Sequence, residues 1–447
     1  MTALVLAGVL ALVPAADERD ALIKALDDDF QELLKKEKDP QPLRDAARLL
    51  AANNASDRWL NYSNATELLR KHRSRAAVPL LLRYMVEHAG LSTGPGVVAE
   101  YVDTLAILTG KDLANPYRYV PDRKAPVNEA VAKLVKEWWG PGKDKINTDL
   151  GKMSPEQLRV VADRVARRAA RRLDASGDDD SSALAISSLV STVVFRGRDR
   201  SRDWSREDLH PAMVPIFLGA IGYVDPKEAK APPAAETHRV PFAVVPLLAA
   251  LRADGAAPQL DKLAEDKNQN TAVRLTCLLA LRAAGERVKA APFLAVLDGE
   301  KQLERRLVAT LALAYTSDRD TATPKLVGLL DDANDEVRTA AVLALRRAAA
   351  KEAIPGLKKI IDGLEPAPVV SQALDGIAEI GTTEAKQVLA GFLKGSLEGG
   401  RKKRYLRDAL WAFERATGQR WVAGGAHDEA YYQEKAKVAL EWWEKHK

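Results

Sequence analysis

The sequence predicts an all-α protein built as an α-solenoid, and two patterns lead to this prediction. Apolar residues recur at helical spacing over short stretches, as between Val337 and Leu345. The same pattern returns every 32 residues, with helix starts at Ala272, Glu304 and Glu336. A short helix pair cannot bury its apolar stripe alone, so copies of it must stack side by side.

Each repeat is predicted to be a hairpin of two helices, with a proline at the start of the second one. Proline suits the first turn of a helix, where its missing N–H would have no partner. The prolines that open these second helices are Pro258, Pro292, Pro324 and Pro355.

The repeat resembles a known family. An acidic residue, Val-Arg and Ala-Leu, followed by an x-Pro-x-Leu helix, is similar to the HEAT-like repeats named after phycobilin lyases. The resemblance covers residues 237 to 420 well and the earlier chain loosely. It implies an α-solenoid that binds something along its inner surface, and it specifies a fold and not an activity.

The N-terminus predicts export. Residues 2 to 16, TALVLAGVLALVPAA, are uncharged and apolar, too short to span a membrane, and end in small residues. We interpret residues 1 to 16 as a signal peptide, although no Lys or Arg precedes the apolar run. The mature protein is then periplasmic or secreted, with no transmembrane segment. The alternative is a buried first helix.

Composition argues against several classes of site. The net charge is +5, from 67 Lys and Arg against 62 Asp and Glu, which is mild for 447 residues and does not demand nucleic acid. The single cysteine, Cys277, rules out an internal disulfide framework, and with six scattered histidines it leaves no metal cluster of the usual types. We predict no cofactor, and a buried, structural role for Cys277.

The chain after residue 16 divides into three parts by pattern. Residues 17–150 form N-terminal helical repeats, residues 151–236 form an irregular helical middle region, and residues 237–447 form the regular array. The middle region ends in a proline-rich stretch without periodicity, which we interpret as a loop or linker.

One module occurs twice. The first copy runs from Thr109-Gly110 to Trp138-Trp139, and the second from Thr417-Gly418 to Trp442-Trp443. In both, glycine stands where a helix should stop with a left-handed residue, and a Glu-Trp-Trp helix follows. We interpret the module as a cap over an open solenoid end. A paired-tryptophan carbohydrate site is the alternative, which we disfavour because four residues of the first copy fit one buried stripe. These are Val131, Leu134, Val135 and Trp138.

A helix opening at Ser154-Pro155-Glu156-Gln157 carries arginines on one side, and these have two interpretations. They could form a ridge that binds an anionic partner. They could equally form an ion-paired surface, which we favour because the acidic run at 178–180 follows and no aromatic residues interleave. The arginines are Arg164, Arg167, Arg168 and Arg171.

The sequence shows no catalytic constellation. It lacks a phosphate loop with a lysine, a Gly-x-Ser-x-Gly elbow and a His-x-x-x-His pair. The leading hypothesis is therefore a non-enzymatic scaffold that binds a protein or peptide partner on its concave face in the bacterial envelope. The alternatives are a phycobilin-lyase-like enzyme that binds a tetrapyrrole, and a HEAT-like protein that binds nucleic acid.

The resemblance implies that the second helix of each repeat lines the concave face. Helical periodicity then directs one row of residues away from the buried stripe and toward a partner. Within this row, apolar residues flanked by lysines are typical of partner sites. The alternative is that the apolar pair packs against the adjoining repeat. The predicted partner-binding residues are Phe293, Val296, Lys325 and Lys359.

Overall fold

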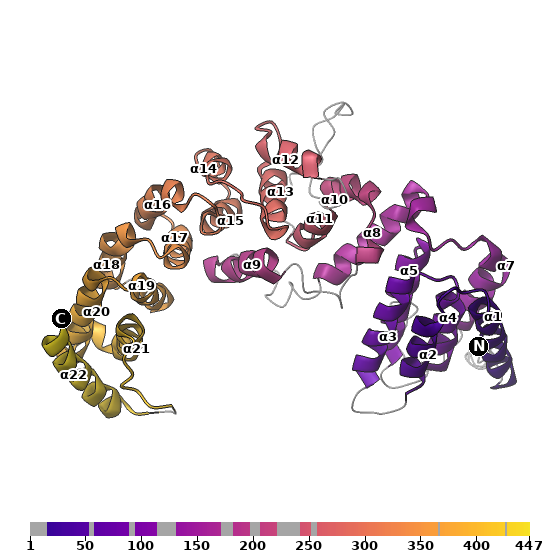
Figure 1. Cartoon of the computed structure of the whole chain (residues 1–447), viewed down its shortest axis with the longest axis horizontal. Helices are drawn as coiled ribbons and strands as arrows, with labels where there is room; N and C mark the ends of the chain where they lie inside the picture. The colour runs from indigo at the N-terminus through magenta and orange to yellow at the C-terminus, as the bar shows by residue number, and fades with distance from the viewer. Residues whose placement is uncertain are drawn as a thin grey trace, which may run out of the picture. The chain divides into compact units, whose positions relative to one another are not determined.

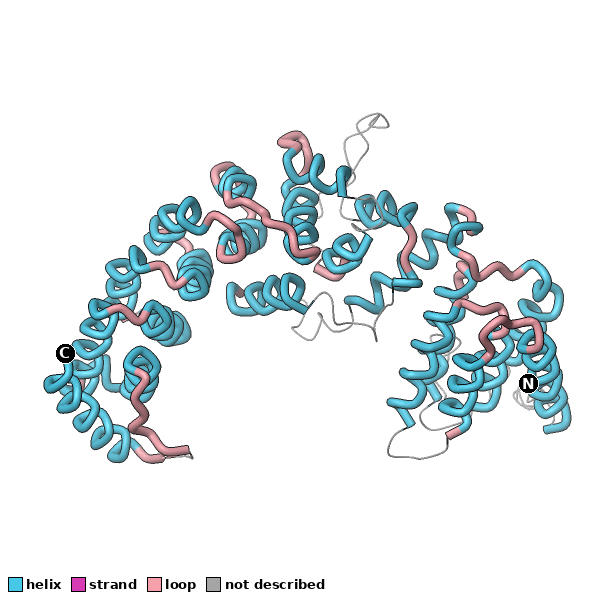
Figure 2. Tube along the Cα trace, viewed as in Figure 1, coloured by secondary structure: helices cyan, strands magenta, loops and turns pink. Residues whose placement is uncertain are grey.

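The structure is a computed structural model, and every regular element in its described residues is a helix (Figure 2). The described ranges contain no strand, which confirms the all-α prediction. No helix within them is long and apolar enough to cross a membrane. The signal-peptide prediction falls mainly on residues 1–15, which lie outside the described ranges. The structure describes residues 16–52, 58–88, 94–113, 131–170, 182–196, 206–220, 242–251, 257–364, 367–424 and 427–447.

Two compact units make up the chain. Unit 1 comprises Met1–Ala175 and Arg198–Ala220 with Ala253–Ala256, and unit 2 comprises Ser176–Gly197, Ile221–Arg252 and Ala257–Lys447. The middle region is therefore shared, because one of its helices belongs to unit 2 and its neighbours on either side belong to unit 1. The three-part division made from sequence remains a prediction.

Unit 1 packs around one hydrophobic core. Its amphipathic helices contribute residues such as Leu26, Leu81 and Tyr101 to that core, each at most 1 % exposed. Helix α5 packs against α3, α4 and α8, which joins the middle region to the N-terminal helices. The helices are α1 (Ala16–Leu34), α2 (Gln41–Ala51), α3 (Arg58–His72), α4 (Ala77–His88), α5 (Gly94–Thr109), α7 (Gly140–Gly142), α8 (Pro155–Ala170) and α10 (Val214–Ala220).

Unit 2 is the regular array, in which a first and a second helix alternate. Asparagine begins two of the first helices, because the side chains of Asn270 and Asn334 accept hydrogen bonds from the free N–H groups of the first turn. The first helices are α11 (Val245–Leu251), α13 (Thr271–Ala283), α15 (Leu303–Leu313), α17 (Asp335–Ala348), α19 (Ala367–Ile380) and α21 (Leu406–Thr417). The second helices are α12 (Ala257–Glu265), α14 (Ala291–Leu297), α16 (Arg319–Gly328), α18 (Ile354–Gly363), α20 (Thr383–Glu398) and α22 (Glu429–His446).

The first helices, and not the second, line the concave side of unit 2 (Figure 1). In this view α15, α17, α19 and α21 form the inner row, and α14, α16 and α18 form the outer row. We call the side formed by the first helices the inner face. The expectation that proline-led helices line it is therefore wrong. The inner helices also carry a helix from the middle region, since α9 (Ala183–Arg196) packs against α13, α15 and α17.

Prolines open most second helices as predicted, with one correction. Pro258, Pro292 and Pro355 stand at the second position of α12, α14 and α18. Pro324 instead lies inside α16, which begins at Arg319. The preceding turn is retained because it buries Ala322 at 1 % exposure.

The duplicated module is present in both units, and its glycines stop helices as predicted. Gly110 and Gly418 have φ of 65° and 72°, in the left-handed region that favours glycine. The C-terminal copy ends in α22, the last helix of the array, which packs on α20 and α21. The second tryptophan of each pair is the buried one: Trp139 is 4 % exposed and Trp443 is 7 % exposed.

The predicted stripe in the first copy is confirmed at Val131 and Val135, but it ends on Trp139 and not on Trp138. Val131, Val135 and Trp139 are buried, whereas Trp138 is only partly so. A π-helical turn spans Val135–Trp139, and because it has more residues per turn than an α-helix, Trp139 and not Trp138 follows Val135 on the buried side. Trp139 then donates from Nε1 to the Asp29 carboxylate at 2.7 Å.

Candidate functional site

Equivalent positions on successive inner helices form a stripe, and the side chains at these positions change from apolar to polar along the array. Its central members are Leu279, Leu311, Leu343, Asp375 and Trp411, spaced by 32 residues and, for the last step, 36. Residues four before and four after each centre share its side of the helix. The stripes are Leu275/Leu279/Ala283, Leu307/Leu311/Tyr315, Thr339/Leu343/Arg347, Ser371/Asp375/Glu379 and Arg407/Trp411/Arg415. The stripe is therefore apolar on α13 and α15, mixed on α17, and polar or aromatic on α19 and α21.

Helix α9 packs on the apolar part of this face. Its Ile186, Val190 and Val193 are each at most 3 % exposed. The backbone N–H of Ala183, at the start of α9, donates to the Glu336 carboxylate at 2.6 Å. Burying the leucines of the inner face under α9 removes apolar surface from water, so we regard α9 as part of unit 2. Among the described residues, α9 packs on α13, α15 and α17, and the inner face of α19 and α21 lies beyond it.

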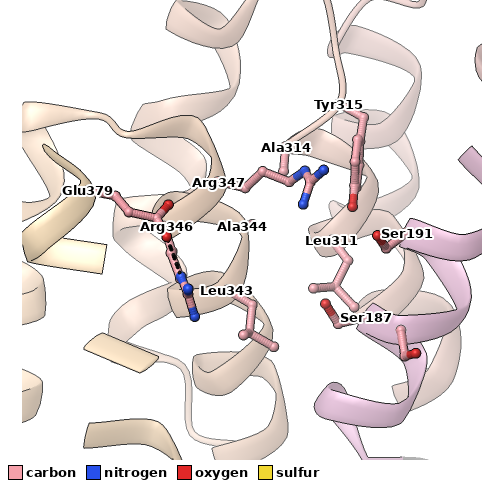
Figure 3. A pocket seen from close by; sticks show the side chains of 11 residues that line it. Ser187, Ser191, Leu311, Ala314, Tyr315, Leu343, Ala344, Arg346, Arg347 and Glu379 are labelled. Carbon is pink, nitrogen blue, oxygen red and sulfur yellow. Dashed lines mark hydrogen bonds and ion pairs between the residues drawn. The ribbon is translucent and has the colours of Figure 1, made fainter. Parts of the chain in front are cut away.

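A polar pocket remains where α9 meets α15 and α17, with a volume of about 330 Å³. Leu311 and Leu343 lie on its apolar side, while Ser187 and Ser191 of α9 face them (Figure 3). The Arg347 guanidinium lies over the Tyr315 ring, 4.6 Å from its centroid. The pocket thus combines hydroxyl groups, an arginine and an apolar wall.

Ion pairs connect α17, α19 and α21 on the inner face. Arg346 bonds Asp375 at 3.0 Å and Glu379 at 2.9 Å, and Asp375 also pairs with Arg415 at 2.7 Å. These groups are partly exposed, so each pair stabilises the fold by no more than about 1 kcal/mol. Their main effect is to hold the arginines and carboxylates in fixed positions across neighbouring repeats.

Among the described residues of this face, Trp411 is a large aromatic side chain that is exposed. It is 42 % exposed, unusual for a large apolar side chain, and the Arg407 guanidinium lies 5.0 Å from its ring centroid. Arg407 and Arg415 flank it four residues away on the same helix face. Tryptophan and arginine are the residue types that most often dominate binding energy at protein interfaces.

The two apolar residues of the predicted partner row are buried, whereas its lysines are at least partly exposed and form ion pairs. Phe293 is 2 % exposed and Val296 is 3 % exposed, so the alternative of packing within the array holds. The cause is the register of α14, whose buried side runs through Phe293, Val296 and Leu297, whereas the predicted buried stripe ran through Leu294 and Leu297. Lys325 pairs with Asp298 at 2.8 Å and Lys359 pairs with Asp331, each bridging neighbouring repeats.

The arginines of α8 are engaged in ion pairs. Arg164 bonds Asp103 at 2.8 Å and Asp112 at 2.6 Å. Arg167 pairs with Asp163 at 2.8 Å within α8, and Arg168 pairs with Glu100 of α5 at 2.7 Å. Arg171 and the acidic run at 178–180 lie outside the described residues. Arg164 and Arg168 thus join α8 to other segments of unit 1, and all three described arginines are ion-paired, which favours the ion-paired interpretation.

Unit 1 also contains fully buried charges. Arg70 of α3 bonds Asp208 at 2.9 Å, and neither side chain has exposed surface. Arg73 reaches the same carboxylate at 3.4 Å. Burial alone would raise the pKa of Glu100, but Arg168 and Arg70 with the hydrogen bonds from Arg168 and Thr66 hold that pKa below its ordinary value. These pairs tie separate segments together, and we assign them a structural role.

Reactive and metal-binding groups are scarce in the described part of the chain. Cys277 is fully buried as predicted, and burial raises the pKa of its thiol to about 12, which makes it a poor nucleophile. Among the described residues, no group of three or more His, Cys, Asp and Glu side chains is placed to hold a metal ion.

Sequence reasoning missed Trp411, Arg347, Tyr315 and the serines of α9. Aligning the first helices at 32-residue spacing shows where leucine gives way to charged residues, and this signal was available. The serines carried no such signal, because the contact between α9 and α17 joins residues about 150 positions apart, as with Ala183 and Glu336.

One comparison with known proteins agrees with the repeat architecture of unit 2. A family model for HEAT repeats matches residues 323–404. An engineered protein solved by the Northeast Structural Genomics Consortium is similar at 15 % identity and a TM-score of 0.36, over 92 % of this chain and 98 % of that one. That likeness is too distant to support an inference, and no curated protein matches the sequence. Residues 323–404 thus match HEAT repeats, and the stacked two-helix repeats of unit 2 continue the same architecture on either side of them.

Proposed function

We propose that this protein is a non-enzymatic scaffold that holds a protein partner on the inner face of α19 and α21. The single observation that carries the proposal is Trp411, exposed between Arg407 and Arg415 where the stripe is open. The occupant we propose is a short helical segment of the partner. It would place an apolar side chain on Trp411 and acidic side chains beside the two arginines.

Helix α9 supports the choice of a helical occupant. It shows that the same row of inner helices accommodates a helix laid against it, with apolar residues toward the array. On α19 and α21 the stripe no longer needs a permanent cover, because Ser371, Asp375 and Glu379 are compatible with water. A partner helix there would bind reversibly, and its specificity would come from the charges that flank Trp411.

The substitution Trp411→Ser is expected to abolish partner capture and leave the fold intact. Truncating an aromatic anchor at the centre of an interface commonly costs about 2–4 kcal/mol of binding free energy, or roughly 30- to 1,000-fold in Kd. Val438→Ser on α22 is the matched control, because Val438 is 43 % exposed and lies outside the stripe. Binding would be measured with a purified partner, first identified by capture on the wild-type protein.

The supporting result is a partner that binds the wild type and Val438→Ser equally but binds Trp411→Ser weakly. Both variants should keep the wild-type melting temperature. Equal Kd values for the wild type, Val438→Ser and Trp411→Ser would show that the partner does not bind the inner face of α19 and α21.

The proposal places the scaffold in the bacterial envelope, and this rests on residues 1–16 alone. We expect the mature protein to begin at or just after residue 16 and to be recovered outside the cytoplasm. Mass spectrometry of its N-terminal peptide in fractionated cells is the measurement. A cytoplasmic protein that still begins at Met1 would end the export proposal without affecting the binding proposal.

A further inference from the structure

Four consecutive basic residues stand just before α21. The short 3-10 helix η10 (Gly400–Tyr405) carries them and leads directly into α21. A 3-10 helix has three residues per turn, so residues three apart lie on the same side and η10 has three sides. Arg401 and Arg404 therefore share one side, and Lys402 and Lys403 lie on the other two.

The two sides that carry lysines pack against neighbouring helices. Lys402 pairs with Asp362 of α18 at 2.9 Å, and Tyr405 on the same side is 2 % exposed. Lys403 pairs with Glu429 of α22 at 2.6 Å. Both lysines are thus neutralised by carboxylates of unit 2.

The third side of η10 is exposed and keeps its charge. Arg401 and Arg404 are both exposed, and within the described residues neither forms an ion pair. The Arg404 guanidinium lies over the Tyr405 ring, 4.7 Å from its centroid, which positions the guanidinium without neutralising it. This side of η10 therefore presents two positive charges to solvent.

The same side continues along α21. Arg407 follows Arg404 after three residues and Trp411 follows after four more, spacings that keep residues on one side of a helix. Beyond Trp411, Arg415 is neutralised by Asp375 at 2.7 Å. The surplus of positive charge is therefore on the η10 side of Trp411.

We call Arg401, Arg404 and Arg407 the arginine row. Arg407 belongs to it because its side chain is 59 % exposed and its ion pair with Asp408 is long, at 3.5 Å. With a rise of about 2.0 Å per residue in a 3-10 helix and about 1.5 Å in an α-helix, the row is about 10 Å long. An extended chain rises about 3.3 Å per residue, so about three or four residues span the row.

We propose that the partner segment that binds Trp411 continues into a short run of acidic residues, which lies along the arginine row. This inference rests on the proposed function and adds the chemistry of the partner next to its apolar anchor. Guanidinium groups suit carboxylates because their donors form a fixed fork.

The distribution of charge favours an acidic polypeptide over a nucleic-acid strand. A nucleic acid gains affinity from each further phosphate that meets a cation. Beyond Trp411, Arg346 and Arg415 are already paired with Asp375 and Glu379, so a long chain of phosphates would gain little there. A short acidic run matches a row that ends after three arginines.

Synthetic peptides with a fluorescent label test the inference. All contain the same helical segment with one leucine to contact Trp411, followed or preceded by a tail of four glutamates or four glutamines. The tail is placed at either end in separate peptides, because the charges do not specify the direction of the partner chain. Fluorescence anisotropy with the full chain measures each Kd.

The key variant combines Arg401→Gln with Arg404→Gln. Lys402→Gln with Lys403→Gln is its matched control, because it removes the same charge from the packed sides of η10. We expect the arginine variant to weaken binding of the glutamate peptide by about three- to tenfold, because two exposed ion pairs are lost. The glutamine peptide should bind the arginine variant and the wild type equally. The lysine variant should keep the preference for the glutamate tail.

Three results would overturn the inference. One is equal Kd values for the two tails, or no binding of either peptide. Another is an equal loss of affinity for the glutamate peptide in the arginine and lysine variants, which indicates general charge attraction. The last is binding of a short oligothymidylate with the same dependence on Arg401 and Arg404, which assigns the row to nucleic acid.

Trp411→Ser separates this inference from the proposed function. It should weaken binding of both peptides to the same degree, because the leucine contact is common to them. If Trp411→Ser changes neither Kd while the glutamate tail still acts through Arg401 and Arg404, the anchor at Trp411 fails and the acidic run stands. If Trp411→Ser weakens both peptides and the tails bind alike, the anchor stands and the acidic run fails.

Discussion

Replacing Asp208 with alanine is expected to destabilise unit 1 by about 3–5 kcal/mol, because it leaves a buried arginine without its carboxylate partner. Arg70 has no exposed surface and bonds Asp208 at 2.9 Å, and Arg73 reaches the same group. The free energy of unfolding, from urea titration followed by circular dichroism at 222 nm, is the measurement. The transition that belongs to unit 1 should move to lower urea.

Two further variants decide whether the loss comes from the buried charge. Asp144→Ala removes a comparable carboxylate, which pairs with Arg75 at 3.0 Å but is 89 % exposed, so it should cost no more than about 1 kcal/mol. The double replacement Arg70→Met with Asp208→Leu should recover most of the stability, because apolar residues of similar volume often replace a buried pair without loss. Equal losses from Asp208→Ala and Asp144→Ala would contradict the structural role that we assign to this pair.

The second large effect is expected in the array, where Phe293→Ser should cost about 3–5 kcal/mol. The phenyl group is 2 % exposed, so its removal leaves a cavity and buries a hydroxyl. Val296→Ser, at a residue 3 % exposed, should cost less because fewer atoms are removed. Thermal unfolding followed by circular dichroism measures both.

Val438→Ser is the control for the array, because it makes the same change as Val296→Ser at an exposed site. Its effect should fall within about 0.5 kcal/mol of zero. If Phe293→Ser and Val296→Ser instead had the melting temperature of the wild type, both side chains would be exposed to solvent. The outer row would then again be a candidate surface for partner binding.

The repeat could be predicted from the sequence alone, because each stacked hairpin needs an apolar stripe on its helices. Residues such as Val337 and Leu345 show that stripe, and it returns every 32 residues. The residues that begin and end helices were also predictable from their neighbours in sequence. Gly110 and Gly418 take the left-handed conformation predicted for them. Ser154 and Gln157 cap each other's backbone N–H at the start of α8, at 3.2 and 3.0 Å. Such features depend on residues a few positions apart, so a single sequence reveals them.

The candidate site was not predictable in the same way, because it depends on which side of each hairpin faces inward. Phe293 and Val296 lie on the side of α14 that packs against the array, and periodicity alone does not decide which of two adjacent stripes on so short a helix is buried. The position of α9 is a contact between distant segments. The position of Trp411 and Arg347 on the inner face can be recognised only once the structure shows which helices form the inner row.

The central claim is that a protein partner binds the inner face of α19 and α21. Amide hydrogen exchange, with and without the purified partner, tests it most directly. We predict slower exchange within Ala367–Ile380 and Leu406–Thr417 when the partner is bound. Exchange in α14, α16 and α18 should stay unchanged. Protection confined to those outer helices, with none on α19 or α21, would contradict the account.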